Sequence, residues 1–96
     1  MPNPSFQIVL TQWAANRLTQ YLDHFRSISV RHHSVFKALN KVLPALRQRP
    51  FDFAIEPEIS DELFTFHYIS YGQIKVIYFV DTDQERVVIV ELCIDV

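Results

Sequence analysis

The chain has 96 residues, 49% of them hydrophobic, which is enough for one core and too little for two. Its formal net charge of −2 argues against the basic footprint that nucleic-acid-binding domains usually carry. The charge is uneven, because residues 17–49 hold seven Lys or Arg and one acid, whereas residues 50–96 hold ten acids and two basic residues. We therefore expect one domain over residues 1–96, with either two oppositely charged faces or one self-complementary surface.

The remaining composition points to a cytoplasmic chain without cofactor or metal. Cys93 is the single cysteine, so no internal disulfide can form. The first residues show no basic region followed by an apolar run, and the longest apolar runs, about five residues, are too short to span a bilayer. Adjacent His32 and His33 would point to different sides of a helix, so no metal site is expected.

The first predicted elements are a strand and an amphipathic helix. Residues 6–10 alternate in the way of a strand. Thr11 then offers an N-cap hydroxyl, and the following apolar residues recur at helical spacing. We expect this helix to end near Arg26 or Ser27. Its apolar stripe consists of Ala14, Leu18, Tyr21, Leu22 and Phe25.

A second helix is predicted to begin after a short connection, with Ser29 as its cap. Pro44 inside this helix predicts a kink or a helix end, and Pro50 predicts a firm stop. Two helices joined by about three residues are expected to form a roughly antiparallel helical hairpin. The apolar stripe of the second helix consists of Val35, Leu39, Val42, Leu43 and Leu46.

The last part of the chain predicts a loop followed by three strands. Residues 51–61 have no clean period and carry four acids, so we expect a loop there. Residues 63–71, 74–81 and 86–94 are strand-like, and their hairpin-length separators predict antiparallel neighbours. The middle strand is apolar at nearly every residue, as a central strand covered on both faces would be.

The expected fold is α+β, in the order β-α-α-β-β-β. The helical hairpin would pack on one face of a curved, mainly antiparallel four-stranded sheet. The opposite face would then stay open as a binding surface. An edge at residues 6–10 or at residues 86–94 could also accept an added strand from a partner.

This order of elements, with Pro50 closing the second helix, resembles the RelE/ParE family of bacterial toxins from toxin–antitoxin pairs. The most specific part is residues 63–78, where an aromatic strand and the Gly72 turn precede Lys75-Val-Ile-Tyr78. The resemblance covers residues 6–95. It implies a growth-inhibiting toxin of the plasmid-stabilisation kind, which cleaves messenger RNA on the ribosome or poisons DNA gyrase. A cognate antitoxin would hold it inactive.

The resemblance implies three candidate catalytic residues, which are Glu56, His67 and Lys75. Lys75 falls where the third family strand usually has an arginine, and Thr65 and His67 fall where the second usually has arginines. Glu56, just before a proline, matches a base used in one branch of the family. Metal-independent RNA cleavage needs such a base, cations for the developing phosphorane charge and an acid for the leaving oxygen.

Departures from the family pattern predict a diluted ribonuclease site. The loop ahead of the second family strand is acidic here, and residues 92–96 lack the usual terminal His, Arg or Tyr. Each missing cation removes one phosphate contact. Efficient RNA cleavage is therefore not expected. The alternative is a non-catalytic RelE-like module that binds a protein, for example as a gyrase-directed poison.

Several residues have a structural interpretation beside the functional one. His67 and Lys75 could be ordinary surface residues, and the tyrosines at positions 68, 71 and 78 could serve packing rather than base stacking. Cys93 is most simply a small core residue. Trp13 would lie at the core edge or in a partner interface. Basic side chains of the second helix could receive an acidic antitoxin segment, or the acidic loop of a second copy in a homodimer.

Overall fold

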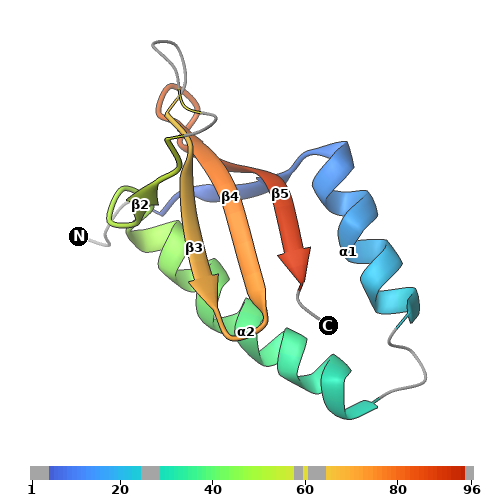
Figure 1. Ribbon diagram of the computed structural model, residues 1–96. Helices are drawn as coiled ribbons and strands as arrows, with labels where there is room; N and C mark the ends of the chain where they lie inside the picture. Colours follow the sequence, from blue (N-terminus) through green and yellow to red (C-terminus); the bar gives the residue numbers. More distant parts are fainter. Residues whose placement is uncertain (1–4, 25–28, 58–59, 61–64, 95–96) are drawn as a thin grey trace.

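The computed structural model describes residues 5–24, 29–57, 60 and 65–94 (Figure 1). Two helices and five strands form an α+β fold with one mixed sheet. Along the chain lie β1 (Gln7–Leu10), α1 (Gln12–His24), α2 (Ser29–Gln48), β2 (Ala54–Ile55), β3 (His67–Tyr71), β4 (Ile74–Asp81) and β5 (Arg86–Ile94).

The strand order in the sheet is β1-β5-β4-β3-β2. β1 is parallel to β5, and the other three pairings are antiparallel. The prediction of four strands was wrong, because β2 lies in the segment predicted as a loop; its two residues are too few to show a period. The prediction of an edge at residues 86–94 was also wrong, since β5 lies between β1 and β4.

β3 begins at His67, later than the sequence predicted. The predicted start at residue 63 lies outside the described residues, but Thr65 and Phe66 are described and are not strand. The Ser60 hydroxyl accepts the Phe66 N–H at 2.9 Å and donates to the Glu56 carbonyl at 2.6 Å. The Phe66 N–H, which would continue the pairing of β3 with β2, is thus bound by the Ser60 side chain instead.

α1 begins as predicted, because Thr11 caps it. The Ala14 N–H donates to Thr11 Oγ1 at 3.2 Å, which satisfies one of the otherwise unpaired amides of the first turn. The predicted end near residue 26 lies outside the described residues. Within the described residues, neither α1 nor α2 combines the length and apolarity that crossing a membrane would require.

α2 continues through Pro44 to Gln48, so of the two predicted outcomes at Pro44, a kink or a helix end, the helix end is excluded. The ring removes one helical hydrogen bond, which would be made to the Asn40 carbonyl. Pro44 and Asn40 are both exposed, so water can bind that carbonyl. Buried Val42 and Leu46 hold the helix to the core on both sides of the proline. The predicted stop at Pro50 is consistent with the observed end.

The two helices diverge from their connection rather than lying side by side, so the predicted helical hairpin does not form (Figure 1). α1 packs against β5 and β1, whereas α2 crosses β3, β4, β5 and β1. Neighbouring strands of a sheet are rotated relative to one another. Each helix therefore follows a different part of the twisted sheet.

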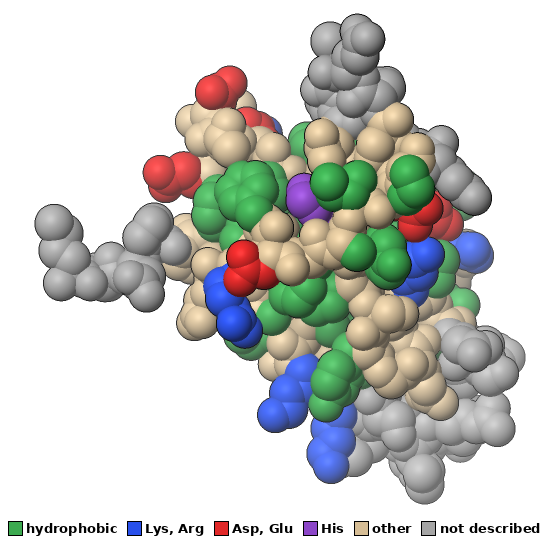
Figure 2. Space-filling view, turned by 60° about the vertical axis from the view of Figure 1, so that its left-hand side comes forward, with side chains coloured by type: hydrophobic (Ala, Val, Ile, Leu, Met, Phe, Trp, Pro, Cys, Tyr) green, Lys and Arg blue, Asp and Glu red, His purple; other side chains and the backbone are tan. Residues whose placement is uncertain are grey.

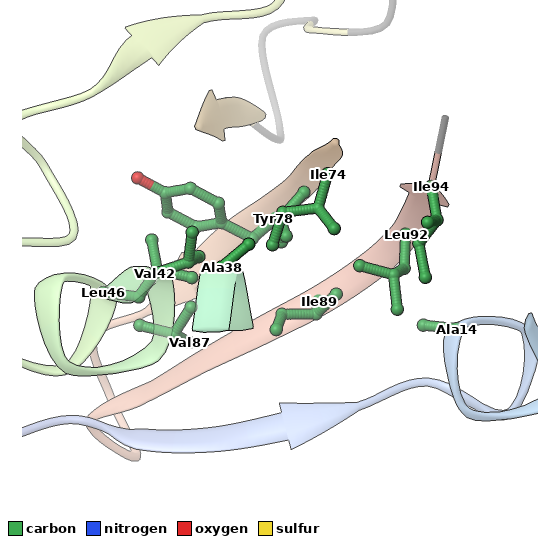
Figure 3. Close-up of a cluster of buried hydrophobic side chains, with 11 residues drawn as sticks. Ala14, Ala38, Val42, Leu46, Ile74, Tyr78, Val87, Ile89, Leu92 and Ile94 are labelled. Carbon is green, nitrogen blue, oxygen red and sulfur yellow. The ribbon is translucent and has the colours of Figure 1, made fainter. Parts of the chain in front are cut away.

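The core lies between the helices and one face of β4 and β5. Cross-strand partners share a face of a sheet, so Tyr78 and Ile89 lie together, as do Val76 and Leu92. Figure 3 shows Val42 and Leu46 of α2 near Tyr78 and Val87, and Ala14 of α1 near Leu92 and Ile94. These side chains are at most 4% exposed.

A register shift in β5 keeps both halves of this strand in the core. Tyr78 pairs with Ile89 while Ile77 pairs with Glu91, so Val90 is the extra residue. Ile89 and Leu92 are three positions apart and would face opposite sides of a regular strand. The bulge returns Leu92 and Ile94 to the helix side.

Candidate functional site

The sheet face turned away from the helices is the candidate functional surface, called the open face below. Its side chains alternate with those of the core along each strand. They are half-buried or exposed, and no described helix covers them. The prediction that β4 is covered on both faces was therefore wrong. The open-face residues of the long strands used below are Val9, Arg86, Val88, Glu91, Cys93, Lys75, Ile77, Phe79, Asp81, Tyr68 and Ser70.

One row across the open face is apolar. Val9 pairs with Val88, which pairs with Phe79. The Phe66 ring lies edge-on to Phe79, with ring centroids 5.8 Å apart. Ile77 is the next apolar residue along β4, between Glu91 and Tyr68. The apolar side chains of this row offer dispersion contacts to a ligand.

Lys75 and Glu56 meet at the other end of the open face. Lys75 Nζ lies 3.3 Å from Glu56 Oε2 and 4.6 Å from the centroid of the Tyr68 ring. The side chains are 40% and 16% exposed. The structure thus brings together two of the three predicted catalytic residues. Because the base and the cation bind each other, neither is presented alone to a phosphate.

His67 lies on the opposite, helix-facing side of the sheet. It is 7% exposed, and its ring stacks on Tyr78 with centroids 5.5 Å apart and planes 19° from parallel. Its Nδ1 lies 3.0 Å from the Phe53 carbonyl, which fits a donated N–H. Since β3 side chains alternate, His67 cannot join Glu56 and Lys75 in one site. Its contacts are those of a packed residue.

The second described cation of the open face is also paired. Arg86 Nη2 lies 3.0 Å from Asp81 Oδ2 across the β4–β5 turn. The hydrogen bond from Arg86 holds the pKa of the Asp81 carboxyl below its ordinary value. The hydrogen bond from the Gln84 N–H lowers this pKa further, by a smaller amount. The carboxylate of Glu91 pairs with neither of these two cations. The open face therefore has no excess of positive charge.

The lowered pKa of Asp81 predicts an acid-dependent loss of stability. A depressed carboxyl pKa stabilises the fold fully above the unfolded-state pKa of about 3.9, and the effect is lost as the pH falls through the folded-state pKa. The urea midpoint of the wild type should therefore exceed that of Asp81→Asn at neutral pH, and the difference should shrink on acidification below about pH 4. A difference that stays constant over this range would contradict the pairing.

Cys93 does not lie in the core as predicted. Of the two places predicted for Trp13, the core edge is excluded, and a partner interface stays a prediction. Trp13 is 60% exposed, with the Arg17 guanidinium 5.8 Å from its ring centroid, so it does not cover the core. Cys93 is half-buried on the open face beside Lys75, not in the core. Burial, followed by the charge of Glu91, raises the pKa of the Cys93 thiol, which lowers its thiolate fraction.

Sequence analysis missed the apolar row of the open face as a functional feature. A signal for it was present, because Ile77 and Phe79 make most of β4 apolar on both sides, and Val88 continues this pattern in β5. That pattern was interpreted as burial on both faces. It equally describes a central strand with one apolar face exposed.

The described residues contain no group of three His, Cys, Asp or Glu side chains that could hold a metal ion. Comparison of the chain with protein-family models, with curated proteins and with solved structures found no match in any of the three.

Proposed function

We propose that the chain is a growth-inhibiting toxin of the RelE/ParE kind that binds a protein target through its open face and does not cleave RNA. A cognate antitoxin would hold it inactive. The observation that carries the choice of mechanism is the pairing of charge: Lys75 binds Glu56, and Arg86 binds Asp81. The toxin role itself is supported by the resemblance of residues 6–95 to the family.

The charges of the open face favour a protein over RNA as the target. Holding an RNA strand requires cations that replace the counterions of several phosphates. Here each described cation already has a carboxylate within 3.3 Å. An apolar row bounded by ion pairs instead matches protein interfaces, which have an apolar centre and a polar rim.

Induced expression in a bacterium tests this proposal. We expect the wild type to arrest growth and Lys75→Ala to arrest it equally, because the ion pair of a half-exposed lysine contributes only about 0–1 kcal/mol to stability. Val88→Asp and Ile77→Asp should each relieve the arrest, since a carboxylate in the apolar row would be buried unpaired at the interface. Gln20→Asp, at an exposed polar residue of α1 on the other side of the sheet, is the control and should still arrest growth.

The thermal unfolding of each purified variant shows whether it is folded. If one of the two apolar-row variants does not fold, the other still tests the proposal. Absence of arrest by the wild type would contradict the toxin role. Arrest that Lys75→Ala relieves, with Val88→Asp and Ile77→Asp still toxic, would favour the ribonuclease instead.

A further inference from the structure

The outer edge of β3 is only partly covered by β2. β2 pairs with Tyr68 and His67, and the Glu56 N–H continues this ladder to the Phe66 carbonyl. In an antiparallel sheet, every second residue of a strand directs both its N–H and its C=O toward the same neighbouring strand. Ser70 follows Tyr68 in this series, so its N–H and C=O point outward. No described strand pairs with β3 beyond Tyr68 (Figure 1).

A cleft lies at the free end of this edge. It has a volume of about 490 Å³, and it is lined by Lys37, Ala38, Lys41, Tyr71, Gly72 and Gln73. α2 forms one wall and the β3–β4 turn the other. The turn lies close to α2, since a Cβ built at Gly72 would be 4.0 Å from the Ala38 Cβ. Tyr71 is 49% exposed, which leaves its ring accessible beside the cleft.

The wall formed by α2 is basic. Lys37 and Lys41 are exposed, one helical turn apart, and neither has an ion-pair partner among the described residues. The α2 sequence contains no acid at all. Figure 2 shows hydrophobic side chains across the middle of this side of the molecule, with Lys and Arg side chains below them and at the right, and acidic side chains above and among them. A ligand at the edge beyond β2 would therefore meet unneutralised positive charge.

We propose that the β3 edge between β2 and Gly72 binds an extended acidic segment of another protein, which adds as a strand in line with β2. Backbone groups of the segment pair with Ser70. Acidic side chains on the helix side of the strand reach Lys37 and Lys41, and the Tyr71 hydroxyl can donate to them. Alternate apolar side chains lie on the open-face side, diagonal to Tyr68.

Two other occupants fit this edge less well. A second copy related by a two-fold axis between paired β3 edges would place both α2 helices on one side of the joined sheet, with Lys37 and Lys41 of the two copies near each other. Like charges so placed are unfavourable. A nucleic acid would match the lysines but would leave the strand-type hydrogen bonds of Ser70 unmade. An acidic peptide strand satisfies both features.

Fluorescence anisotropy with the purified chain tests this inference. The probe is a labelled eight-residue peptide of alternating glutamate and valine, at physiological salt so that distant charges are screened. The wild type should bind it, and Lys37→Glu combined with Lys41→Glu should weaken binding about tenfold or more. The matched control reverses Arg47 and Arg49, exposed cations near the other end of α2, and should change affinity less than about twofold.

The same peptide with alternate backbone nitrogens methylated tests strand addition without altering the protein, and should not bind. No binding of the unmethylated probe, or binding that ignores the lysine reversal or the methylation, would overturn the proposal. Tighter binding of a labelled oligouridylate of equal length would assign the edge to nucleic acid. A dimer in sedimentation that the probe dissociates would assign it to a second copy. These measurements are independent of growth arrest, so this inference and the proposed function can fail separately.

Discussion

Leu46→Ala is expected to lower the free energy of unfolding by about 2–5 kcal/mol. Leu46 is 0% exposed and lies in the centre of the core, against the side of the sheet that carries Tyr78 and Val87 (Figure 3). Truncation removes three methyl or methine carbons and leaves a cavity that the surrounding sheet and helix cannot fill.

Urea unfolding at neutral pH measures this loss. Leu10→Ala is the control, since it removes the same atoms from a leucine that is 39% exposed at the end of β1. Leu10→Ala should lower the free energy of unfolding clearly less than Leu46→Ala, because folding withdraws less apolar surface from water at Leu10. Equal losses in the two variants would mean that α2 is not seated on the sheet as described.

Tyr78→Phe is expected to destabilise the fold by about 1–3 kcal/mol. Tyr78 is 0% exposed, and its hydroxyl donates to the Pro50 carbonyl just after α2. Burial, with a smaller effect of the Asp52 charge, raises the pKa of this hydroxyl, so it remains a donor across the physiological range. Phenylalanine keeps the ring in place but leaves a buried carbonyl without its donor.

Tyr68→Phe, on the open face, is the matched control. It removes the same oxygen from a half-buried tyrosine and should change the free energy of unfolding by less than about 0.5 kcal/mol. If both variants are as stable as the wild type, the contact between Tyr78 and Pro50 does not connect the end of α2 to the sheet.

The packing of His67 affects how activity data on this chain should be interpreted. Its ring contacts Tyr78 and Phe51, and its Nδ1 binds the Phe53 carbonyl. His67→Ala therefore removes contacts of the core and of the segment before β2. Lost toxicity in that variant would indicate lost folding as readily as lost chemistry. Lys75→Ala avoids this ambiguity because its side chain lies at the surface of the open face.

The sequence predicted the local features that rest on one or two residues. The Thr11 cap, the stop before Pro50 and the turn at Gly72 are local choices of the backbone. Gly72 has a φ of 57°, which glycine adopts at no steric cost and which fits the first position of a type II′ hairpin turn. The hairpins around Gly72 and residues 82–85 were predicted from the short length of the segments between the strands.

The strand β2, the divergence of the two helices and the side on which His67 lies depend on distant contacts, and they were not predicted. Ala54 and Ile55 become a strand only because β3 offers an edge to pair with. The helices separate because the twisted sheet presents different faces to each. The arrangement of the three candidate residues has a related basis: residues 56, 67 and 75 carry suitable chemistry, but only the register of β3 and β4 shows that His67 lies on the other side of the sheet.

The central claim is that toxicity comes from binding, and the state of messenger RNA in arrested cells tests it most directly. Mapping of 5′ ends soon after induction of the wild type should show transcripts as intact as those in cells arrested by an unrelated means. New cleavage ends within coding regions, absent when Lys75→Ala is induced at the same level, would contradict the claim and make the open face a ribonuclease site.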